Sequence, residues 1–126
     1  DECLRLHGDF TERRWPDIAL SVISYHADSL PLFTPAAHRY YLPAFFRVAL
    51  SRELPMGHIL LNMLIYDLCP DDTAWWQQRF GVFTPSQLRA SASWLEFVLA
   101  HETDFCPDTR VGHSGYERYW RLDRNA

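Results

Sequence analysis

Eight prolines divide this chain of 126 residues into short segments, and their positions constrain its fold more than any other feature. The tripeptide Phe-Thr-Pro occurs twice, at residues 33–35 and 83–85. Threonine is a preferred N-cap of helices, and proline is tolerated in the first helical turn because the N–H that it lacks would have no partner there. The sequence therefore predicts that one helix begins after Thr34 and another after Thr84.

The second of these helices carries further signals. Gln87 stands three residues after Thr84, which is the spacing of a capping box. Apolar residues then recur three and four positions apart and form one stripe, as expected for an amphipathic helix: Leu88, Ala92, Leu95 and Leu99. No stretch of the sequence alternates apolar and polar residues for long enough to predict a strand.

Two other prolines predict where helices begin or break. The segment around Pro16 predicts a helix over residues 16–28, and residues 1–14 before it are expected to be irregular. Pro43 should interrupt the helix that starts after Thr34, because an internal proline removes a hydrogen bond and clashes with the preceding turn. We therefore expect two short helices, residues 36–41 and 43–53, bent away from each other.

The second half of the chain shows similar punctuation. Residues 58–68 are apolar almost all round, which predicts a central buried helix. The aspartates at residues 71–72 predict the cap of a short helix that holds two tryptophans. Residues 103–113 are expected to form a loop, and a capping box over residues 114–117 should open a last helix that ends near residue 123.

Together these elements predict an all-α fold. We expect a single domain over residues 1–126, a compact bundle of about five to seven short, proline-kinked helices with no substantial sheet. Hydrophobic residues make up 48% of the chain and aromatic residues 15%, which is enough apolar material for one core in a domain of this length.

Charge and residue usage exclude several classes of function. The net charge of −4 argues against non-specific binding to nucleic acid, and all twelve basic residues are arginine, so no lysine can act in catalysis. The longest apolar run is too short to cross a membrane. The three cysteines, Cys3, Cys69 and Cys106, have neither disulfide-framework nor zinc-site spacing, which predicts free thiols and a cytoplasmic protein.

Three segments carry a family resemblance. Residues 15–18 read Trp-Pro-Asp-Ile, residues 33–45 contain Arg-Tyr-Tyr-Leu-Pro-Ala, and residues 83–87 read Phe-Thr-Pro-Ser-Gln. The chain thus resembles a bacterial family of small helical proteins, catalogued as a domain of unknown function, with Trp-x-Asp-Ile, Phe-Arg-Tyr-Tyr-Leu-Pro-Ala and Leu-Thr-x-x-Gln motifs. The resemblance spans nearly the whole chain and implies fold boundaries but no activity. His38 stands where that family often has phenylalanine, which implies a polar or exposed contact.

Two sets of residues are candidates for contact with another protein. Arg39, Tyr40 and Tyr41 lie beside the expected bend, and arginine and tyrosine are favoured at interaction hot spots. The same tyrosines are candidates to pack inward and to satisfy backbone groups with their hydroxyls. The second set consists of acidic residues near two expected helix ends: Asp67, Asp71, Asp72, Glu102, Asp104 and Asp108. These acids form either one lobe that attracts a basic protein or ordinary surface.

Signatures of catalysis are weak. The sequence has no phosphate loop, nucleophile elbow or helical zinc motif, so we assign no catalytic residue, metal or cofactor. One segment nevertheless gathers possible metal ligands: His101, Glu102, Asp104, Cys106, Asp108 and His113. This segment leaves a small metal-dependent hydrolase open as an alternative, and a structural subunit of a larger assembly is another.

The sequence therefore favours a non-enzymatic protein-binding module, which is expected to act without nucleic acid or membrane. The most specific form of this hypothesis is an immunity protein that neutralises a toxin by occluding it. Its partner would then be a basic toxin domain, covered by acidic helix ends and exposed aromatic residues.

Overall fold

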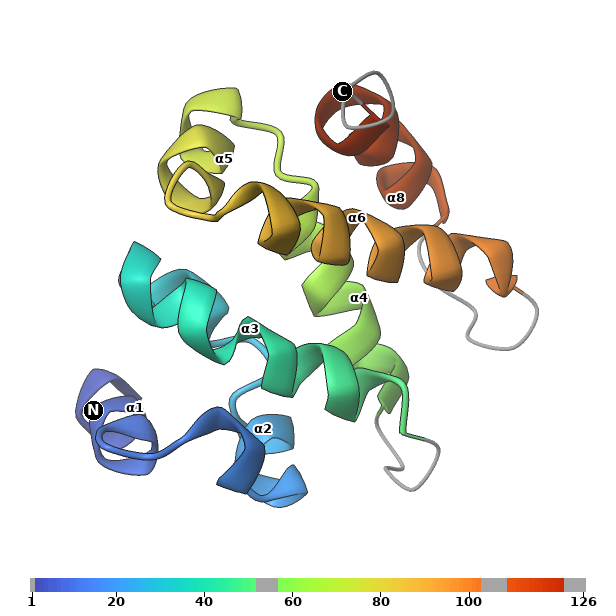
Figure 1. Ribbon diagram of the computed structural model, residues 1–126. Coiled ribbons are helices and arrows are strands. Elements are labelled where there is room, and N and C mark those ends of the chain that lie inside the picture. The colour runs from blue at the N-terminus through green and yellow to red at the C-terminus, as the bar shows by residue number, and fades with distance from the viewer. Residues whose placement is uncertain (1, 52–56, 103–108, 122–126) are drawn as a thin grey trace.

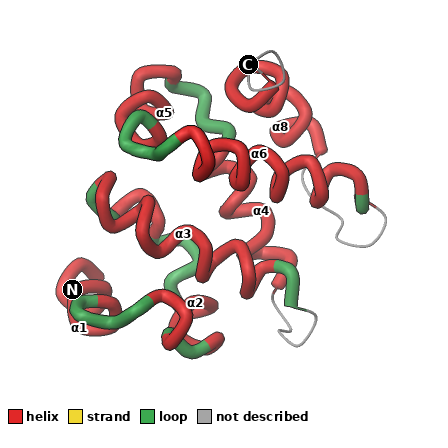
Figure 2. The backbone as a smooth tube through the Cα atoms, in the orientation of Figure 1, coloured by secondary structure: helices red, strands yellow, loops and turns green. Residues whose placement is uncertain are grey.

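The computed structural model describes residues 2–51, 57–102 and 109–121, and within these ranges it contains helices and no strand (Figures 1 and 2). The N-terminal half comprises α1 (Glu2–Phe10), η1 (Trp15–Asp17), α2 (Leu20–Tyr25), η2 (Leu30–Leu32) and α3 (Pro35–Ala49). The C-terminal half comprises α4 (Gly57–Leu68), α5 (Thr73–Phe80), α6 (Pro85–Ala100), α8 (Thr109–Gly115) and the π-helical turn η3 (Tyr116–Trp120). The predicted all-α fold is confirmed. None of the helices in these ranges combines the length and apolar character that a membrane crossing requires.

Helix α4 joins the two halves. In Figure 1 it passes behind the space between α3 and α6, which lie on either side of it. Helix α3 packs against η1, α2, α4 and α5, whereas α6 packs against α8 and η3, and α4 also contacts α8. The residues of α4 that face these neighbours are at most 1% exposed: Leu60, Leu61, Leu64, Ile65 and Leu68. The prediction of a central buried helix is therefore confirmed.

The two helix starts predicted at the Phe-Thr-Pro tripeptides are also confirmed. The Thr34 side chain accepts a hydrogen bond from the backbone N–H of Ala37 at the start of α3. Thr84 and Gln87 form the complete capping box at the start of α6. Each cap satisfies N–H groups that the first helical turn leaves without a partner, and such a signal is local to the sequence.

The predicted break at Pro43 is wrong, because α3 runs without interruption from Pro35 to Ala49. An internal proline costs about 3 kcal/mol. On both sides of it, however, α3 buries large apolar side chains, Leu42, Phe45 and Val48, each at most 1% exposed. Burial of one such side chain contributes about 1.5–3 kcal/mol, so packing on several neighbours outweighs the cost of the proline.

The N-terminal region also differs from the prediction. Residues 2–10 form α1 rather than an irregular segment, and Leu6 and Phe10, one helical turn apart, are buried against the core. The helix predicted over residues 16–28 is instead the 3₁₀ turn η1 followed by the shorter α2. Ile18 separates them in an extended conformation, and its side chain is 4% exposed.

The predicted helix start at Ser114 is wrong as well. Helix α8 begins at Thr109 and continues through Ser114 into η3, so the part of the expected loop that the structure describes, from Thr109 on, is helical. Residues 103–108 and 122–126 lie outside the described residues. Two glycines of α8, Gly112 and Gly115, are both buried. They permit α8 to approach its neighbours closely.

Candidate functional site

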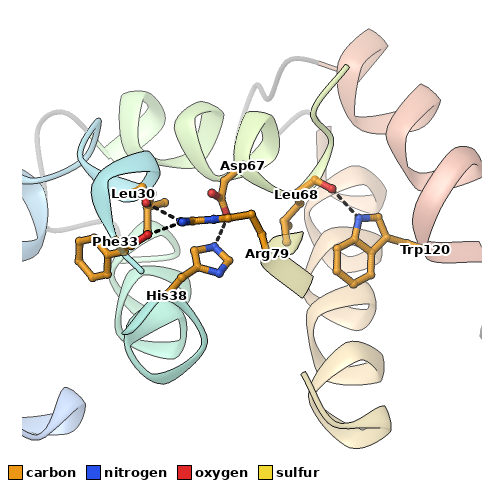
Figure 3. A network of polar contacts seen from close by, with 7 residues as sticks. All are labelled: Leu30, Phe33, His38, Asp67, Leu68, Arg79 and Trp120. Carbon is orange, nitrogen blue, oxygen red and sulfur yellow. Dashed lines mark hydrogen bonds and ion pairs between the residues drawn. The ribbon is translucent and has the colours of Figure 1, made fainter. Parts of the chain in front are cut away.

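A buried histidine and a carboxylate meet where α3 faces the end of α4. The Nε2 of His38 lies 2.7 Å from Oδ2 of Asp67, and the two side chains are 0% and 6% exposed. Figure 3 shows His38 reaching Asp67 from α3, with Arg79 approaching from α5. The contact at His38 is therefore polar, as the family comparison implied, but it is buried.

The second ring nitrogen of His38, Nδ1, indicates which of the two ring nitrogens carries a proton. Nδ1 is buried and has no hydrogen-bond partner among the described residues. A doubly protonated ring would leave a charged donor without an acceptor there, which costs more than an unpaired lone pair. We therefore assign the neutral tautomer, in which Nε2–H donates to Asp67 and orients its carboxylate.

Arg79 is the second buried polar group of this region, at 3% exposed. Its NH2 group donates to the carbonyl oxygen of Leu30 at 2.6 Å, and its NH1 group donates to the carbonyl oxygen of Phe33. Burial lowers the pKa of the Arg79 guanidinium, and the nearby charge of Asp67 opposes that shift. Arg79 thus fastens η2 to α5 and places a positive charge near Asp67.

Two aromatic side chains hold the end of α4 in place from the C-terminal side. The indole N–H of Trp120 donates to the carbonyl oxygen of Leu68 at 2.8 Å, as Figure 3 shows. The Tyr119 hydroxyl donates to the carbonyl oxygen of Pro70 at 2.6 Å. Because Leu68 ends α4 and Pro70 follows it, both contacts help to fix the last turn of α4, which holds Asp67.

A cavity of about 150 Å³ opens beside this network, and we call it the Asp67 cavity. It is lined among others by Asp28, Leu30, Met63, Tyr66, Asp67 and Trp75. Tyr66 and Trp75 are 42% and 36% exposed, and Asp28 is exposed too, so the cavity lies at the surface. The Arg79 guanidinium carbon lies 5.1 Å from the centre of the Trp75 ring.

Only one of the two carboxylate oxygens of Asp67 accepts a hydrogen bond from another described residue. Its Oδ2 is bonded to His38, whereas Oδ1 has no hydrogen-bond partner among the described residues. A carboxylate accepts several hydrogen bonds, and leaving one oxygen without any is costly at a buried position. Asp67 therefore presents a fixed, negatively charged acceptor to the cavity.

The other acidic candidates near α4 have local roles. Asp72 is the N-cap of α5 and accepts from the backbone N–H groups of Ala74 and Trp75 at 2.9 and 3.3 Å. Asp71 is exposed and lines a separate cavity of about 250 Å³ together with Arg110 and Arg118. Of the three, only Asp67 lines the cavity that Tyr66 and Trp75 also line.

The remaining acidic candidates lie elsewhere. Glu102 follows the end of α6 and accepts from Nε2 of His113 at 2.7 Å. In Figure 1, α6 leads away from α5 toward the opposite side of the molecule. Asp104 and Asp108 lie outside the described residues. The single acidic lobe therefore stays a prediction.

The Arg39–Tyr41 candidates point in different directions. The Tyr41 hydroxyl lies 2.6 Å from the carbonyl oxygen of Phe10 and 2.9 Å from that of Arg13, so it anchors the end of α1. Arg39 donates to the carbonyl oxygen of Val82 at 3.0 Å. Tyr40 is 44% exposed. Tyr41 thus packs inward and its hydroxyl satisfies backbone carbonyl groups, whereas Tyr40 lies at the surface.

The segment proposed for the alternative metal site is only partly described. His101 contacts the carbonyl oxygen of Phe97 through Nδ1 at 2.7 Å, and His113 is paired with Glu102. Within residues 2–51, 57–102 and 109–121, no three histidine, cysteine or acidic side chains are close enough to share a metal ion. The other candidates of this segment, Asp104, Cys106 and Asp108, are not among the described residues.

Sequence reasoning missed most of the residues that build the Asp67 cavity. One signal was available: residues 75–76 are both tryptophan, and adjacent helical residues point about 100° apart, so only one of them can face the core fully. The structure buries more of Trp76, which packs on Phe80 and Trp120, and leaves Trp75 at the surface. Nothing in the sequence marks Arg79 as a buried residue.

These features define an all-α protein with a fixed carboxylate and two partly exposed aromatic rings at a surface cavity. The chain belongs to a family of unknown function, DUF6714, whose family model matches residues 5–124. No curated protein and no solved structure matches the chain. The match confirms that the chain belongs to a family of unknown function over nearly its whole length, and it supplies no activity.

Proposed function

We propose that this chain is a non-enzymatic, cytoplasmic bacterial protein that binds another protein through the surface around the Asp67 cavity. We call this surface the acidic–aromatic face and define it by Asp28, Tyr66, Asp67 and Trp75. The observation that carries the proposal is that Tyr66 and Trp75 line the same cavity and are both partly exposed. Tyrosine and tryptophan supply most of the binding energy in many protein interfaces.

The charge of this face indicates the kind of partner. Asp28 is exposed there, Asp67 lines the cavity, and the chain as a whole carries a net charge of −4. Complementary charge steers association and excludes partners of the same sign. A basic protein is therefore the partner that this face fits.

The histidines best placed by their hydrogen bonds support a binding role over a catalytic one. His26 and His38 are each paired with an aspartate, at 2.8 and 2.7 Å, and both are 0% exposed. A general base must come within hydrogen-bond reach of the substrate. Both imidazole rings are buried, and the two pairs join α1 to the residue that follows α2 and α3 to α4.

The most specific form of the proposal is an immunity protein whose partner is a basic toxin domain. The acidic–aromatic face would cover the basic active site of the toxin and exclude its substrate. This form adds one requirement to the general proposal, namely that binding inhibits the partner.

Site-directed photo-cross-linking in the native cell tests the proposal. A benzophenone amino acid replaces Trp75 in one strain and Tyr25 in another, because Tyr25 is equally aromatic, 50% exposed and outside the cavity lining. We expect one cross-linked protein from position 75 and none of that size from position 25. The same pattern from both positions, or no cross-link from position 75, would overturn the proposal.

The cross-linked partner, once purified, allows a quantitative test by calorimetry. Trp75→Ser and Tyr66→Ser should each weaken binding by about 2 kcal/mol or more, as expected of hot-spot residues. Tyr25→Ser is the matched control and should leave the affinity unchanged. An enzymatic assay of the partner then decides whether binding also inhibits it.

A further inference from the structure

We infer that the Asp67 cavity is a socket for a single primary ammonium group, supplied in the cell by a lysine side chain of the partner. The partner in this statement rests on the proposed function, whereas the socket is a property of this chain alone. The inference stands on the size of the cavity, on its charges and on the one free oxygen of Asp67.

Size limits the occupant first. Pockets for drug-sized molecules and cofactors usually measure about 300–1,000 Å³, and a single water needs only about 10–15 Å³ of the same kind of space. The Asp67 cavity, at about 150 Å³, lies between these limits. It has room for one slender side chain and not for a cofactor.

Charge selects a cation. The acidic groups that face the cavity are Asp67 of α4 and Asp28 of the turn after α2. The opposing charge is Arg79 of α5, whose two terminal nitrogens are already bonded to the carbonyls of Leu30 and Phe33. Two carboxylates against one guanidinium leave one negative charge unbalanced, and one bound cation would neutralise it.

The aromatic rings favour the same kind of ligand. Tyr66 and Trp75 line the cavity, and the faces of such rings attract cations. The Arg79 guanidinium already lies over the Trp75 ring, which shows that this ring accepts a cation at one face. An entering alkylammonium would also bury its methylene groups against Leu30 and Met63.

The hydrogen bonding of Asp67 discriminates between ammonium and guanidinium. A guanidinium binds a carboxylate best in a fork, with one N–H to each oxygen. In this structure His38 occupies Oδ2 of Asp67, so only Oδ1 is open to a ligand. An ammonium needs a single acceptor in one direction, and Asp67 offers one.

The test uses the full chain and a small probe in place of a partner. Protonated n-butylamine is titrated into the ¹⁵N-labelled protein in amine-free phosphate buffer at pH 7, and the indole N–H signal of Trp75 is followed by NMR. We expect saturable binding that is clearly tighter than that of the neutral analogue 1-pentanol and of n-butylguanidinium. Equal binding of 1-pentanol, tighter binding of n-butylguanidinium, or no saturable shift would overturn the inference.

Variants connect the signal to the carboxylates. Asp67→Asn should weaken binding of n-butylammonium about tenfold or more, because charge-assisted hydrogen bonds are about twice as strong as neutral ones. Asp17→Asn removes an exposed aspartate of η1 outside the cavity lining and should change nothing. Equal effects of the two variants would refute the socket.

A second variant, Asp28→Asn, tests the same inference if Asp67→Asn does not fold. Asp28 is exposed, so its loss leaves the core intact and should weaken the probe about two- to fivefold, as for a partly solvated charge. Unchanged affinity in this variant would contradict the inference. The titration and the cross-linking experiment test different proposals. Probe binding without a cross-linked protein would refute the proposed protein partner alone. A cross-linked protein without probe binding would refute the ammonium socket alone.

Discussion

Gly115 of α8 lies so close to Cys69 that a Cβ built on the glycine would stand 2.2 Å from the Cys69 Sγ and 3.0 Å from its backbone Cα. The contact packs α8 onto the chain just after α4, two residues beyond Asp67. Because the nearest atoms belong to the backbone and to a short side chain, they cannot move aside freely. Gly115→Ala should therefore destabilise the protein by about 1–3 kcal/mol, measured by urea denaturation.

Gly8 provides the matched control for this substitution. It lies within α1, is exposed, and a Cβ there would meet nothing within 4 Å. Gly8→Ala should stabilise the protein by about 0.5–1 kcal/mol, because glycine loses more backbone entropy than alanine in a helix. Similar effects of the two substitutions would show that α8 does not approach α4 as the structure has it.

Tyr41 and Tyr40 form a second matched pair. The Tyr41 hydroxyl shares its proton between two carbonyls at the end of α1, whereas Tyr40 is 44% exposed. Tyr41→Phe should cost about 1 kcal/mol and increase amide hydrogen exchange in α1. Tyr40→Phe should stay within about 0.5 kcal/mol of the natural chain. Equal exchange in both variants would mean that Tyr41 does not hold α1.

What the sequence could predict depends on how local each signal is. Thr34, Thr84 and Asp72 are helix caps in the structure because a cap needs only the next three residues. Pro43 was misjudged because its cost is local, whereas the burial of Phe45 that outweighs it depends on helices far along the chain. Local rules therefore gave these three helix starts, and tertiary packing decided where helices continue.

The candidate site follows the same division. Asp67 was one of several acidic candidates, and the sequence could not distinguish it from Asp71, which is exposed in the structure. The distinction comes from His38 and Arg79, which lie 29 and 12 positions away along the chain. Residues that far apart meet only in the folded protein, so a single sequence carries no sign of their contact.

The pairing of His38 with Asp67 makes a further prediction about the proton between them. Asp67→Asn keeps an oxygen that accepts from Nε2–H, so it should cost less than about 1 kcal/mol. Asp67→Leu leaves that buried donor without an acceptor and should cost about 2 kcal/mol. Both costs are measured by urea denaturation of the full chain.

The comparison also tests the assigned tautomer of His38. A doubly protonated ring beside an asparagine would be a buried charge without its partner, at a cost of about 3–5 kcal/mol. Asp67→Asn would then destabilise at least as much as Asp67→Leu. That result would contradict the neutral histidine and, with it, the single unbalanced charge of the cavity.

The thiol of Cys69 makes stability depend on pH in the alkaline range. Burial, with a smaller contribution from the charge of Asp67, raises the pKa of Cys69 to about 12. An unfolded chain releases this proton near pH 8.5–9, so above that range the folded state holds a proton that the unfolded state has lost. Stability is therefore complete below about pH 8.5 and falls as pH rises toward 12, by about 2 kcal/mol between pH 9 and 10.5.

Cys69→Ala isolates this effect, because it removes the thiol while every other titrating group remains. The pKa of Tyr41 is also raised, by burial and by Tyr40, so its ionisation lowers the stability of both proteins alike at high pH. Urea denaturation at pH 9 and 10.5 should thus show a loss about 2 kcal/mol larger in the natural chain than in Cys69→Ala. Equal losses would mean that the Cys69 thiol has an ordinary pKa in the folded state. They would also mean that Gly115 of α8 does not bury this thiol.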